Sequence, residues 1–404
     1  MEKSKSMKLT YLISGRSASS WGVGRKILEV TDSFKKLIPT ELVCGGDIKG
    51  GIGYKNVNHT VQSVAEYHKK WYRQNEVLNF FVRSLSELKD LYHCYETYLY
   101  LKKITSQETI IWERSSRLHF AGIYLAKKRN LPCVLEWKDH LVDYKFSLLH
   151  SFALYIEKWK NKTADYIAVE SEVLKSQLIN EGVDGRKIYV AYNAVNPDEF
   201  KKDEKAYREI REEFGIKEND LLVGYVGSYA FYHDSIRMVK AAKILKDDGN
   251  QNIKWLLIGD GKDKFECEKY ARDNALLGEN VFMLPFQSKE LIPRYLSAMD
   301  VAILPGSTDI ICPIKVMEYM AAKSVVLVPD YECNREIING HNGLLFKPKD
   351  ENSIVEALLS LNNNHKRCRE LGDAARRTVV ERLTWDKTYG IVLRCILENI
   401  VKKV

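Results

Sequence analysis

The sequence predicts an α/β protein with two doubly wound parallel sheets, each covered by helices. Short runs of β-branched and other apolar residues alternate with helix-length segments along all 404 residues. These runs lie at residues 9–14, 41–44, 109–112, 133–136, 166–169, 188–191, 221–226, 255–258, 281–284, 301–304, 325–328 and 343–346. Strands that are apolar on both sides and separated by helices are typical of parallel sheets.

A charged stretch near the middle of the chain marks the boundary between the two sheets. Residues 201–213 are rich in Lys and Glu, and the alternation of strands and helices starts again at Asp220. We therefore expect a first domain at residues 1–200 and a second domain at 201–383. Because open α/β sheets bind ligands beyond the carboxyl ends of their strands, two facing sheets would hold a ligand in a cleft between them.

The composition excludes disordered and fibrous classes of protein and leaves several partners open. The apolar fraction is 45%, and 62 Lys and Arg against 54 Asp and Glu give a net charge of +8. This surplus is compatible with an anionic substrate, a membrane surface or nucleic acid, and it requires none of them. The sequence contains no apolar run of about 18 residues, and the apolar run after the basic start is too short for a signal peptide. We interpret the chain as cytoplasmic.

The cysteines predict reduced thiols. The chain has 8 Cys, which are widely scattered and show no C-x-x-C spacing. Such a pattern fits neither a zinc site nor a disulfide framework. No convincing Asp-x-Asp pair stands at a predicted strand end either, so we expect no obligatory metal.

Two glycines follow the first predicted strand. Gly22 and Gly24 lead into Arg25 and Lys26, and glycines at a helix start let backbone N–H groups approach an anion. The pattern lacks the third glycine of the dinucleotide fingerprint, which argues against an NAD-linked oxidoreductase. An ordinary turn explains these two glycines equally well.

Two similar turns follow strands of the second domain. Gly227, Ser228 and His233 come after one strand, and Gly259 and Gly261 come after the next. A phosphate or the edge of a base can meet backbone N–H groups at such turns. Each turn taken alone is also compatible with an ordinary connection between a strand and a helix.

A lysine and a glutamate follow a later strand of the second domain. Pro313 stands where it can begin a helix, and Lys315 and Glu318 would then share one helix face. A carboxylate can accept hydrogen bonds from two ribose hydroxyls, and an ammonium can balance a diphosphate. The alternative is a surface ion pair between Lys315 and Glu318.

Titratable residues cluster after two strands of the first domain. Lys138, Asp139 and His140 follow one strand, and Glu113 and Arg114 lie at the end of another and would face the same cleft. Such clusters suit acid–base chemistry or the recognition of hydroxyl groups. The alternative is a solvated loop.

Aromatic and basic side chains are interleaved over residues 66–103 in a helical pattern. A helix of this kind can lie on an anionic membrane surface. It can also cover a sheet with its apolar face. The sequence leaves both interpretations open.

The order and spacing of these motifs resemble those of the family 4 glycosyltransferases. The matching stretches are residues 164–171, 188–196, 223–228, 257–261, 281–286, 313–322, 325–328 and 339–346. Members of this family are retaining nucleotide-sugar enzymes with two facing Rossmann-like domains, the GT-B fold. The resemblance also implies that a final helix, residues 384–404, crosses back to pack on the first domain.

The resemblance implies a role for each candidate residue. Glu318 would hold the ribose hydroxyls, and the backbone at Phe286 would meet the base. The other residues in contact with the nucleotide sugar would be Gly22, Gly24, Gly227, Ser228, His233, Gly259, Gly261, Ile311, Cys312, Ile314 and Lys315. In catalysis Lys315 would stabilise the leaving diphosphate, while Asp139 and His140 would orient the acceptor.

The sequence departs from the family pattern at the phosphate end of the donor. Ile310 stands where the Glu-x7-Glu pattern of the family has its first acid. Ser228 and His233 stand near the places of an Arg and a Lys that bind the diphosphate in the family. Lys315 would supply the missing positive charge.

We therefore expect a hexosyltransferase that moves a sugar from a UDP- or GDP-linked donor to an acceptor hydroxyl with retention, without an obligatory cofactor. The acceptor would be a saccharide or a lipid-linked saccharide in the biosynthesis of cell-surface polysaccharide or glycoconjugates. The protein would act in the cytoplasm, in peripheral contact with the inner face of an anionic membrane, and would not bind nucleic acid. The alternatives are a catalytically inactive partner subunit of the same fold and a nucleotide-sugar epimerase.

Overall fold

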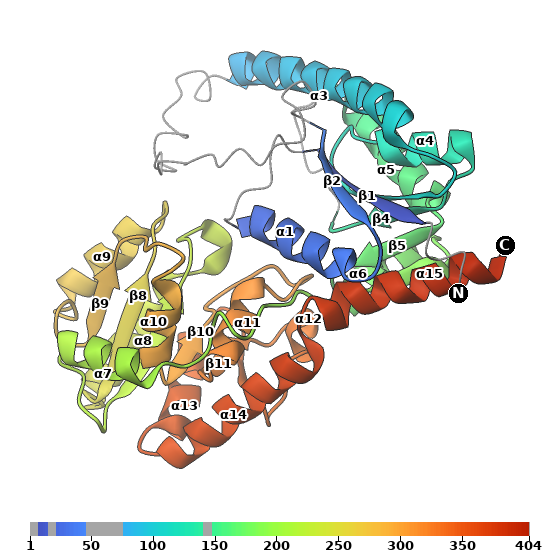
Figure 1. Ribbon diagram of the computed structural model, residues 1–404. Coiled ribbons are helices and arrows are strands. Elements are labelled where there is room, and N and C mark those ends of the chain that lie inside the picture. The colour runs from blue at the N-terminus through green and yellow to red at the C-terminus, as the bar shows by residue number, and fades with distance from the viewer. Residues whose placement is uncertain (1–6, 15–21, 46–75, 140–147, 404) are drawn as a thin grey trace. The chain divides into compact units, whose positions relative to one another are not determined.

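The chain forms two compact units, each with its own parallel sheet (Figure 1). The computed structural model describes residues 7–14, 22–45, 76–139 and 148–403. The first unit comprises Met1–Tyr192 with Trp385–Val404, and the second comprises Asn193–Thr384. Each sheet has six strands, which confirms the predicted fold class of two doubly wound α/β sheets.

The sheet of the first unit has the strand order β2-β1-β3-β4-β5-β6. Its strands are β1 (Lys8–Ile13), β2 (Thr40–Cys44), β3 (Thr109–Arg114), β4 (Cys133–Glu136), β5 (Tyr166–Val169) and β6 (Ile188–Val190). Its helices are α1 (Gly22–Lys35), α3 (Glu76–Ile104), α4 (Ala121–Arg129), α5 (His150–Thr163), α6 (Glu172–Asn180) and α15 (Ile391–Lys403), with short helical turns η4 (Gly185–Lys187) and η6 (Asp386–Gly390). Neighbouring strands run parallel throughout.

The sheet of the second unit has the strand order β12-β11-β10-β7-β8-β9. Its strands are β7 (Leu221–Val226), β8 (Ile253–Ile258), β9 (Val281–Leu284), β10 (Val301–Ile303), β11 (Val325–Pro329) and β12 (Leu344–Phe346). Its helices are α7 (Glu204–Glu213), α8 (Ile236–Asp247), α9 (Lys264–Asp273), α10 (Ile292–Ala298), α11 (Ile314–Ala321), α12 (Glu332–Arg335), α13 (Glu351–Leu361) and α14 (His365–Arg382), with a short turn η5 (Phe231–His233).

Both strand orders contain a point at which the chain reverses its direction of growth across the sheet. This point lies between β1 and β3 in the first unit and between β7 and β10 in the second. In open α/β sheets, ligands bind outside the carboxyl ends of the strands at such a point, because the connections on its two sides leave in opposite directions. We therefore expect a binding site at the loops after β7 and β10.

Apolar side chains cover both faces of the sheets, which explains why the strands appear as unbroken apolar runs in the sequence. β10 and β11 are buried along their whole length. In the second unit Leu245 of α8 and Leu358 of α13 belong to the same buried cluster as Val223 and Leu327 of the sheet. Burying one such side chain contributes about 1.5–3 kcal/mol, so the sheet and its helices form one core.

Several predictions from the sequence are confirmed at this level. Every predicted strand forms, with its ends shifted by no more than one or two residues. All 8 cysteines are free, as predicted, and most of them are buried. The predicted helix within residues 66–103 is α3, which begins at Glu76, while residues 66–75 lie outside the described part of the chain. No described helix is long and apolar enough to cross a membrane.

Candidate functional site

Two glycine turns pack against each other beyond the ends of β7 and β8. Gly259 has a φ of +143°, and a Cβ atom there would run into the carbonyl group of Gly227. Gly261 has a φ of +157°, and its Cβ would lie 2.5 Å from the carbonyl oxygen of Tyr229. Only glycine tolerates this backbone and this close approach. These glycines therefore have a packing role of their own.

The side chain of Lys315 reaches the end of β7 from the first turn of α11. Its Nζ lies 3.2 Å from Nε2 of His233 and 5.0 Å from the ring centroid of Tyr225. A Cβ atom on Gly227 would collide with the same Nζ, so this glycine leaves the space that the ammonium occupies. The fold thus brings together Gly227, His233 and Lys315, three predicted site residues from two separate stretches of the chain.

Burial sets the charges of Lys315 and His233. Burial lowers the pKa of Lys315 to about 8, an effect that Glu318 partly opposes. Burial and the neighbouring Lys315 lower the pKa of His233 to about 4, so His233 is neutral at pH 7. Its Nδ1 lies 3.0 Å from the carbonyl oxygen of Gly306, which can only accept, so we assign the proton to Nδ1. Nε2 then accepts a hydrogen bond from the Lys315 ammonium.

The N-terminus of α11 is open to a ligand. Pro313 is the N-cap and lies just before the first turn, and α11 has neither a side-chain cap nor an acidic residue in that turn. The first N–H groups of a helix lack intrahelical partners and attract anions. The Tyr319 hydroxyl holds this helix against β7, because it donates to the carbonyl of Val226 over 2.9 Å and accepts from its N–H over 3.0 Å.

Asp260 orders the loop after β9, where the resemblance predicts the base. Its Oδ2 accepts from the N–H of Phe286 over 2.7 Å, and its Oδ1 accepts from Nζ of Lys264 over 3.0 Å. The backbone at Phe286 is thereby held next to the glycine turn at residues 259–261, with the aromatic ring exposed. Glu318 lies one turn after Lys315 on α11 and is half-buried.

The remaining predicted donor-site residues lie near these groups in the sequence of the second unit. Ser228 follows Gly227, and its carbonyl accepts from the Tyr225 hydroxyl over 2.7 Å. Ile311 and Cys312 precede α11, and Ile314 is its first residue. Nδ2 of Asn193 donates to the Cys312 carbonyl over 3.1 Å, which fixes the approach to the helix.

A buried charge network lies at the carboxyl ends of strands in the first unit. Glu136, at the end of β4, accepts from the Tyr11 hydroxyl over 2.7 Å and pairs with Arg114. Lys26 of α1 pairs with Glu170 over 2.6 Å. Burial alone would raise the pKa of Glu136, but Arg114 and Lys26 lower it to about 2. This edge of the sheet is therefore charged and tightly paired.

Lys138 and Asp139 follow Glu136 directly. Burial, helped by Arg114, lowers the pKa of Lys138 to about 8. His140 lies outside the described residues, so its role stays a prediction. Gly22 and Gly24 lie in the first turn of α1, and the turn that precedes them, residues 15–21, also lies outside the described part of the chain.

The expectation that Glu113 faces a ligand cleft is wrong. Glu113 is buried, and its Oε2 accepts from the N–H of Ile123 over 2.9 Å at the start of α4. Its carboxylate caps that helix, and the favourable position of an anion at a helix N-terminus explains the arrangement. A carboxylate at the end of a strand can thus serve packing instead of a substrate.

Sequence reasoning missed Tyr319 and Asp260 as residues that shape the site. The backbone group that Tyr319 binds lies 93 residues away in the sequence, so no local pattern announces the contact. Asp260 lies between Gly259 and Gly261, which the sequence predicts as a turn, and only the hydrogen bond to Phe286 shows what its side chain does.

An open helix start and an ammonium at the switch point of a parallel sheet are typical of α/β proteins that bind nucleotides or other phosphates. Residues 206–378 match the model of the family glycosyl transferases group 1. The matched region lies within the second unit, and the fold of the chain is similar to that of solved glycosyltransferases. Membership of family 4 stays a prediction.

Three proteins illustrate the similarity. An uncharacterized glycosyltransferase of Methanocaldococcus jannaschii is 25% identical over 327 residues, which are 78% of this chain and 84% of that protein. The crystal structure of Anabaena HepE in complex with UDP superposes with a TM-score of 0.70 at 12% identity, covering 96% of this chain and 99% of HepE. The lipopolysaccharide outer core galactosyltransferase WaaB has a TM-score of 0.63 at 16% identity, covering 97% of this chain and 100% of WaaB.

Proposed function

We propose that the protein is a retaining hexosyltransferase that uses a UDP- or GDP-linked sugar as donor. The observation that carries the proposal is the ammonium of Lys315 at the open N-terminus of α11, next to Gly227. A diphosphate placed there would meet a cation and unpaired N–H groups, which both stabilise negative charge. The likeness to HepE, which is crystallised with UDP, supports a UDP-linked donor.

The nucleoside end of the donor would lie on the same unit. Glu318 would accept hydrogen bonds from both ribose hydroxyls, and the backbone at Phe286 would contact the base. Asp260 supports this assignment because it holds the Phe286 N–H in place over 2.7 Å. Gly259 and Gly261 would let the nucleotide approach the backbone closely.

The transfer step needs little covalent chemistry from the protein. The bond between the anomeric carbon and the diphosphate oxygen breaks, and a bond from the acceptor oxygen to the same face of that carbon forms. The acceptor proton passes to the leaving diphosphate. Negative charge grows on the diphosphate in the transition state, so Lys315 and the helix N–H groups stabilise the transition state more than the ground state. Neutral His233 keeps Lys315 in position, and this charge arrangement would work without an obligatory metal.

The acceptor would be a saccharide or a lipid-linked saccharide of a cell-surface polysaccharide or glycoconjugate. The likeness to WaaB, named as a lipopolysaccharide outer core galactosyltransferase, supports this class of acceptor. Asp139 and His140 would orient the acceptor hydroxyl, and Gly22 and Gly24 would close over the donor. Positioning of this kind supplies much of the rate acceleration in a two-substrate reaction.

The helix α3 would bring the protein to the inner face of an anionic membrane. One side of α3 exposes a row of large apolar residues at helical spacing, namely Val77, Phe81, Leu85, Leu88, Tyr92, Tyr95 and Leu99. Lys102 and Lys103 lie in the last turn of the same helix. Apolar rings with basic neighbours suit the boundary between lipid headgroups and acyl chains, and a lipid-linked acceptor is found there.

Ile310 favours one rival proposal, a catalytically inactive partner subunit. It stands where the family has an acid, so the sugar would lose one polar contact. An epimerase of the same fold is the second rival.

Turnover assays separate the three proposals. The full chain is incubated with UDP- and GDP-linked hexoses, with and without saccharide acceptors, and the release of nucleoside diphosphate is measured together with the anomeric configuration of the product. A retaining transferase releases UDP or GDP faster with an acceptor and keeps the anomeric configuration of the donor. An inactive subunit releases none with any donor, and an epimerase yields a changed hexose without an acceptor. Either of these two results would overturn the proposal.

A further inference from the structure

A cavity lies in the second unit at the opposite end of the strands from the candidate donor site. It has a volume of about 250 Å³ and is lined by Lys202, Glu204, Tyr207, Asp300, Lys323, His365, Cys368 and Arg369. Asp300 immediately precedes β10, and Lys323 shortly precedes β11, which places the cavity at the amino ends of the strands. It is therefore distinct from the site around Lys315.

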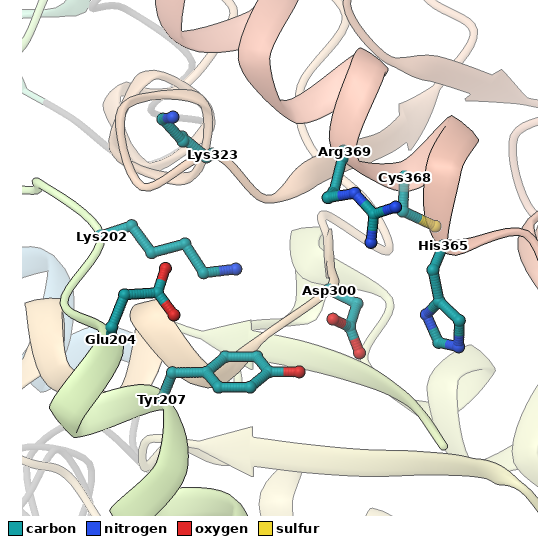
Figure 2. A pocket seen from close by; sticks show the side chains of 8 residues that line it. All are labelled: Lys202, Glu204, Tyr207, Asp300, Lys323, His365, Cys368 and Arg369. Atoms are coloured by element: carbon teal, nitrogen blue, oxygen red, sulfur yellow. The ribbon is translucent and has the colours of Figure 1, made fainter. Parts of the chain in front are cut away.

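Two pairs of side chains form the walls of this cavity. Figure 2 shows Lys202 and Tyr207 entering from one side and Arg369 and His365 from the other, with Asp300 between them. Tyr207 belongs to α7, while His365 and Arg369 lie one turn apart at the start of α14. Three separate stretches of the chain therefore direct polar groups into one small space.

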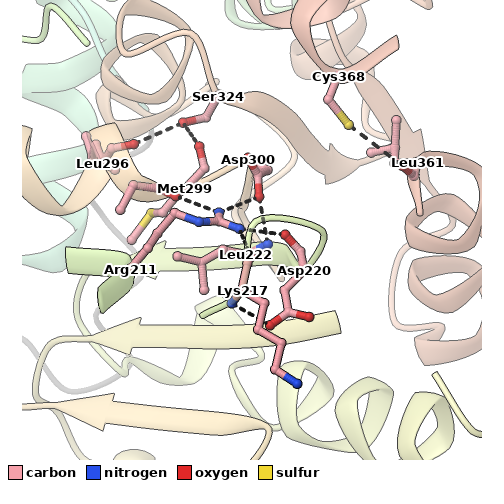
Figure 3. A network of polar contacts seen from close by, with 11 residues as sticks. Arg211, Lys217, Asp220, Leu222, Leu296, Met299, Asp300, Ser324, Leu361 and Cys368 are labelled. Atoms are coloured by element: carbon pink, nitrogen blue, oxygen red, sulfur yellow. Dashed lines mark hydrogen bonds and ion pairs between the residues drawn. The ribbon is translucent and has the colours of Figure 1, made fainter. Parts of the chain in front are cut away.

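At the floor of the cavity, the carboxylate of Asp300 is held by hydrogen bonds and paired with Arg211. Oδ2 of Asp300 accepts from Nη1 of Arg211 and from the N–H of Leu222, each over 2.9 Å. The buried Arg211 also donates to the carbonyls of Lys217 and Asp220, over 2.8 and 2.7 Å (Figure 3). Because Arg211 pairs with Asp300, that carboxylate compensates the charge of Lys202 only in part.

Two cations of the walls, Lys202 and Arg369, form no ion pair with a described residue, whereas Lys323 pairs with Asp373 over 2.7 Å. Among the described residues, the side chains of Lys202 and Arg369 also form no hydrogen bond, and the imidazole of His365 forms neither a hydrogen bond nor an ion pair. Burial lowers the pKa of Lys202, although Asp300 and the exposed Glu204 partly oppose this effect. The ammonium of Lys202 lies 4.9 Å from the ring centroid of Tyr207, which holds it toward the cavity.

The start of α14 adds further positive charge beside the cavity. The helix has no acidic residue in its first turn, and it begins His365-Lys-Arg-Cys-Arg369. Basic side chains at a helix N-terminus oppose the helix dipole, so helix stability does not explain them. A bound anion would explain both the basic residues and the unpaired cations of the cavity.

We propose that this cavity binds a small phosphate-bearing anion, either inorganic phosphate or a phosphate monoester. Arginine and lysine together match the oxygens of a phosphate dianion. The cavity is smaller than the ~300–1,000 Å³ of pockets for drug-sized ligands, so the ligand is smaller than a nucleotide sugar. The Tyr207 hydroxyl and the His365 imidazole are placed to bind the same anion or the hydroxyls of its ester group.

Calorimetry on the full chain tests this site. UDP is present throughout to occupy the donor site, and ionic strength is kept constant with KCl. Inorganic phosphate and glycerol 3-phosphate are titrated in separate arms, so that binding in one arm or both identifies the source of the phosphate group. The double variant with Lys202→Met and Arg369→Met should bind at least about tenfold more weakly, which corresponds to ~1.4 kcal/mol.

The matched control is Lys366→Met, because Lys366 lies in the same turn of α14 with its side chain 83% exposed and outside the cavity. This variant should bind like the wild type. Circular dichroism checks that each variant folds, and the two single variants replace the double one if it does not. The proposal is overturned if neither anion binds, or if Lys366→Met and the cavity variants weaken binding equally.

Discussion

The ligand-free protein offers the positive charge of Lys315 little compensation by negative charge. Its nearest polar partner is the neutral His233 at 3.2 Å, and burial lowers the pKa of Lys315 to about 8. Because the charged form is disfavoured in the folded state, we expect this ammonium to destabilise the ligand-free protein, and the proposed diphosphate would offset that cost. Such a conflict between stability and function is expected at a binding site.

We expect Lys315→Met to stabilise the ligand-free protein at pH 7. The melting temperature should rise by about 2–4 °C, the shift that corresponds to ~1 kcal/mol in a unit of this size. The pKa of Lys315 is about 8 in the folded chain and 10.5 in the reference state. Between these values the unfolded chain binds more protons, so the wild type gains stability as pH rises. The advantage of the variant should therefore shrink from pH 7 to pH 10.

Thermal unfolding at the two pH values measures this difference. The control is Lys347→Met, because Lys347 is 78% exposed in the second unit. A variant at Lys315 that is less stable than the wild type at pH 7 would contradict the idea that its charge is held under strain.

At the scale of single residues, the sequence predicts the chemical type of the site residues better than it predicts which residues are in contact. Lys315, His233 and Gly227 were singled out by residue type and position after a strand, and the fold brings them together. Glu113 was assigned to a ligand cleft on the same grounds and instead caps α4. Glu113 differs from these residues because its side chain points into the core of the first unit. The identity of a single residue does not show whether its side chain points inward.

At the scale of elements, the strands are predictable because they are buried on both faces. β4, β5, β7 and β9 begin and end where their apolar runs do. β3 continues through Arg114, a charged residue that the sequence places beyond the strand, because Arg114 is paired with Glu136 inside the network. Charge compensation from a neighbouring strand is not visible in the local pattern.

The prediction at the scale of elements is that helix α3 contacts a membrane. Its row of exposed apolar side chains includes Phe81 and Leu85, and Leu91 of the same helix packs against the buried Leu118 and Ala153. The sequence left the choice between a core helix and a membrane helix open. The structure shows a helix with one packed side and one exposed apolar side.

We expect the full chain to sediment with vesicles that contain anionic lipid and much less with neutral vesicles. Phe81→Ser combined with Leu85→Ser should reduce this binding by about tenfold or more, because each burial of a large apolar side chain is worth ~1.5–3 kcal/mol. Val380→Ser, at an exposed position of α14, is the control. Equal sedimentation of the wild type and the α3 variant would refute membrane contact through α3.

At the scale of the whole molecule, the alternation of strands and helices is sufficient to predict two doubly wound sheets. Each sheet has one switch point, and in the second unit Gly227, His233 and Lys315 lie together beside it. The cavity at the amino ends of the strands could not be predicted, because Lys202, Asp300 and Arg369 lie far apart in the sequence and match no motif. Its residues become a group only through the packing of α7 and α14 around the sheet.

The central claim is that the second unit binds the nucleoside diphosphate through α11. Calorimetric titration of the full chain with UDP and with GDP tests it most directly. The account predicts one site per chain for at least one of the two nucleotides, with affinity at least about tenfold weaker, or ~1.4 kcal/mol, in both Lys315→Met and Glu318→Gln and unchanged in Lys347→Met. If neither nucleotide binds, or if both variants of α11 bind like the wild type, the claim is wrong.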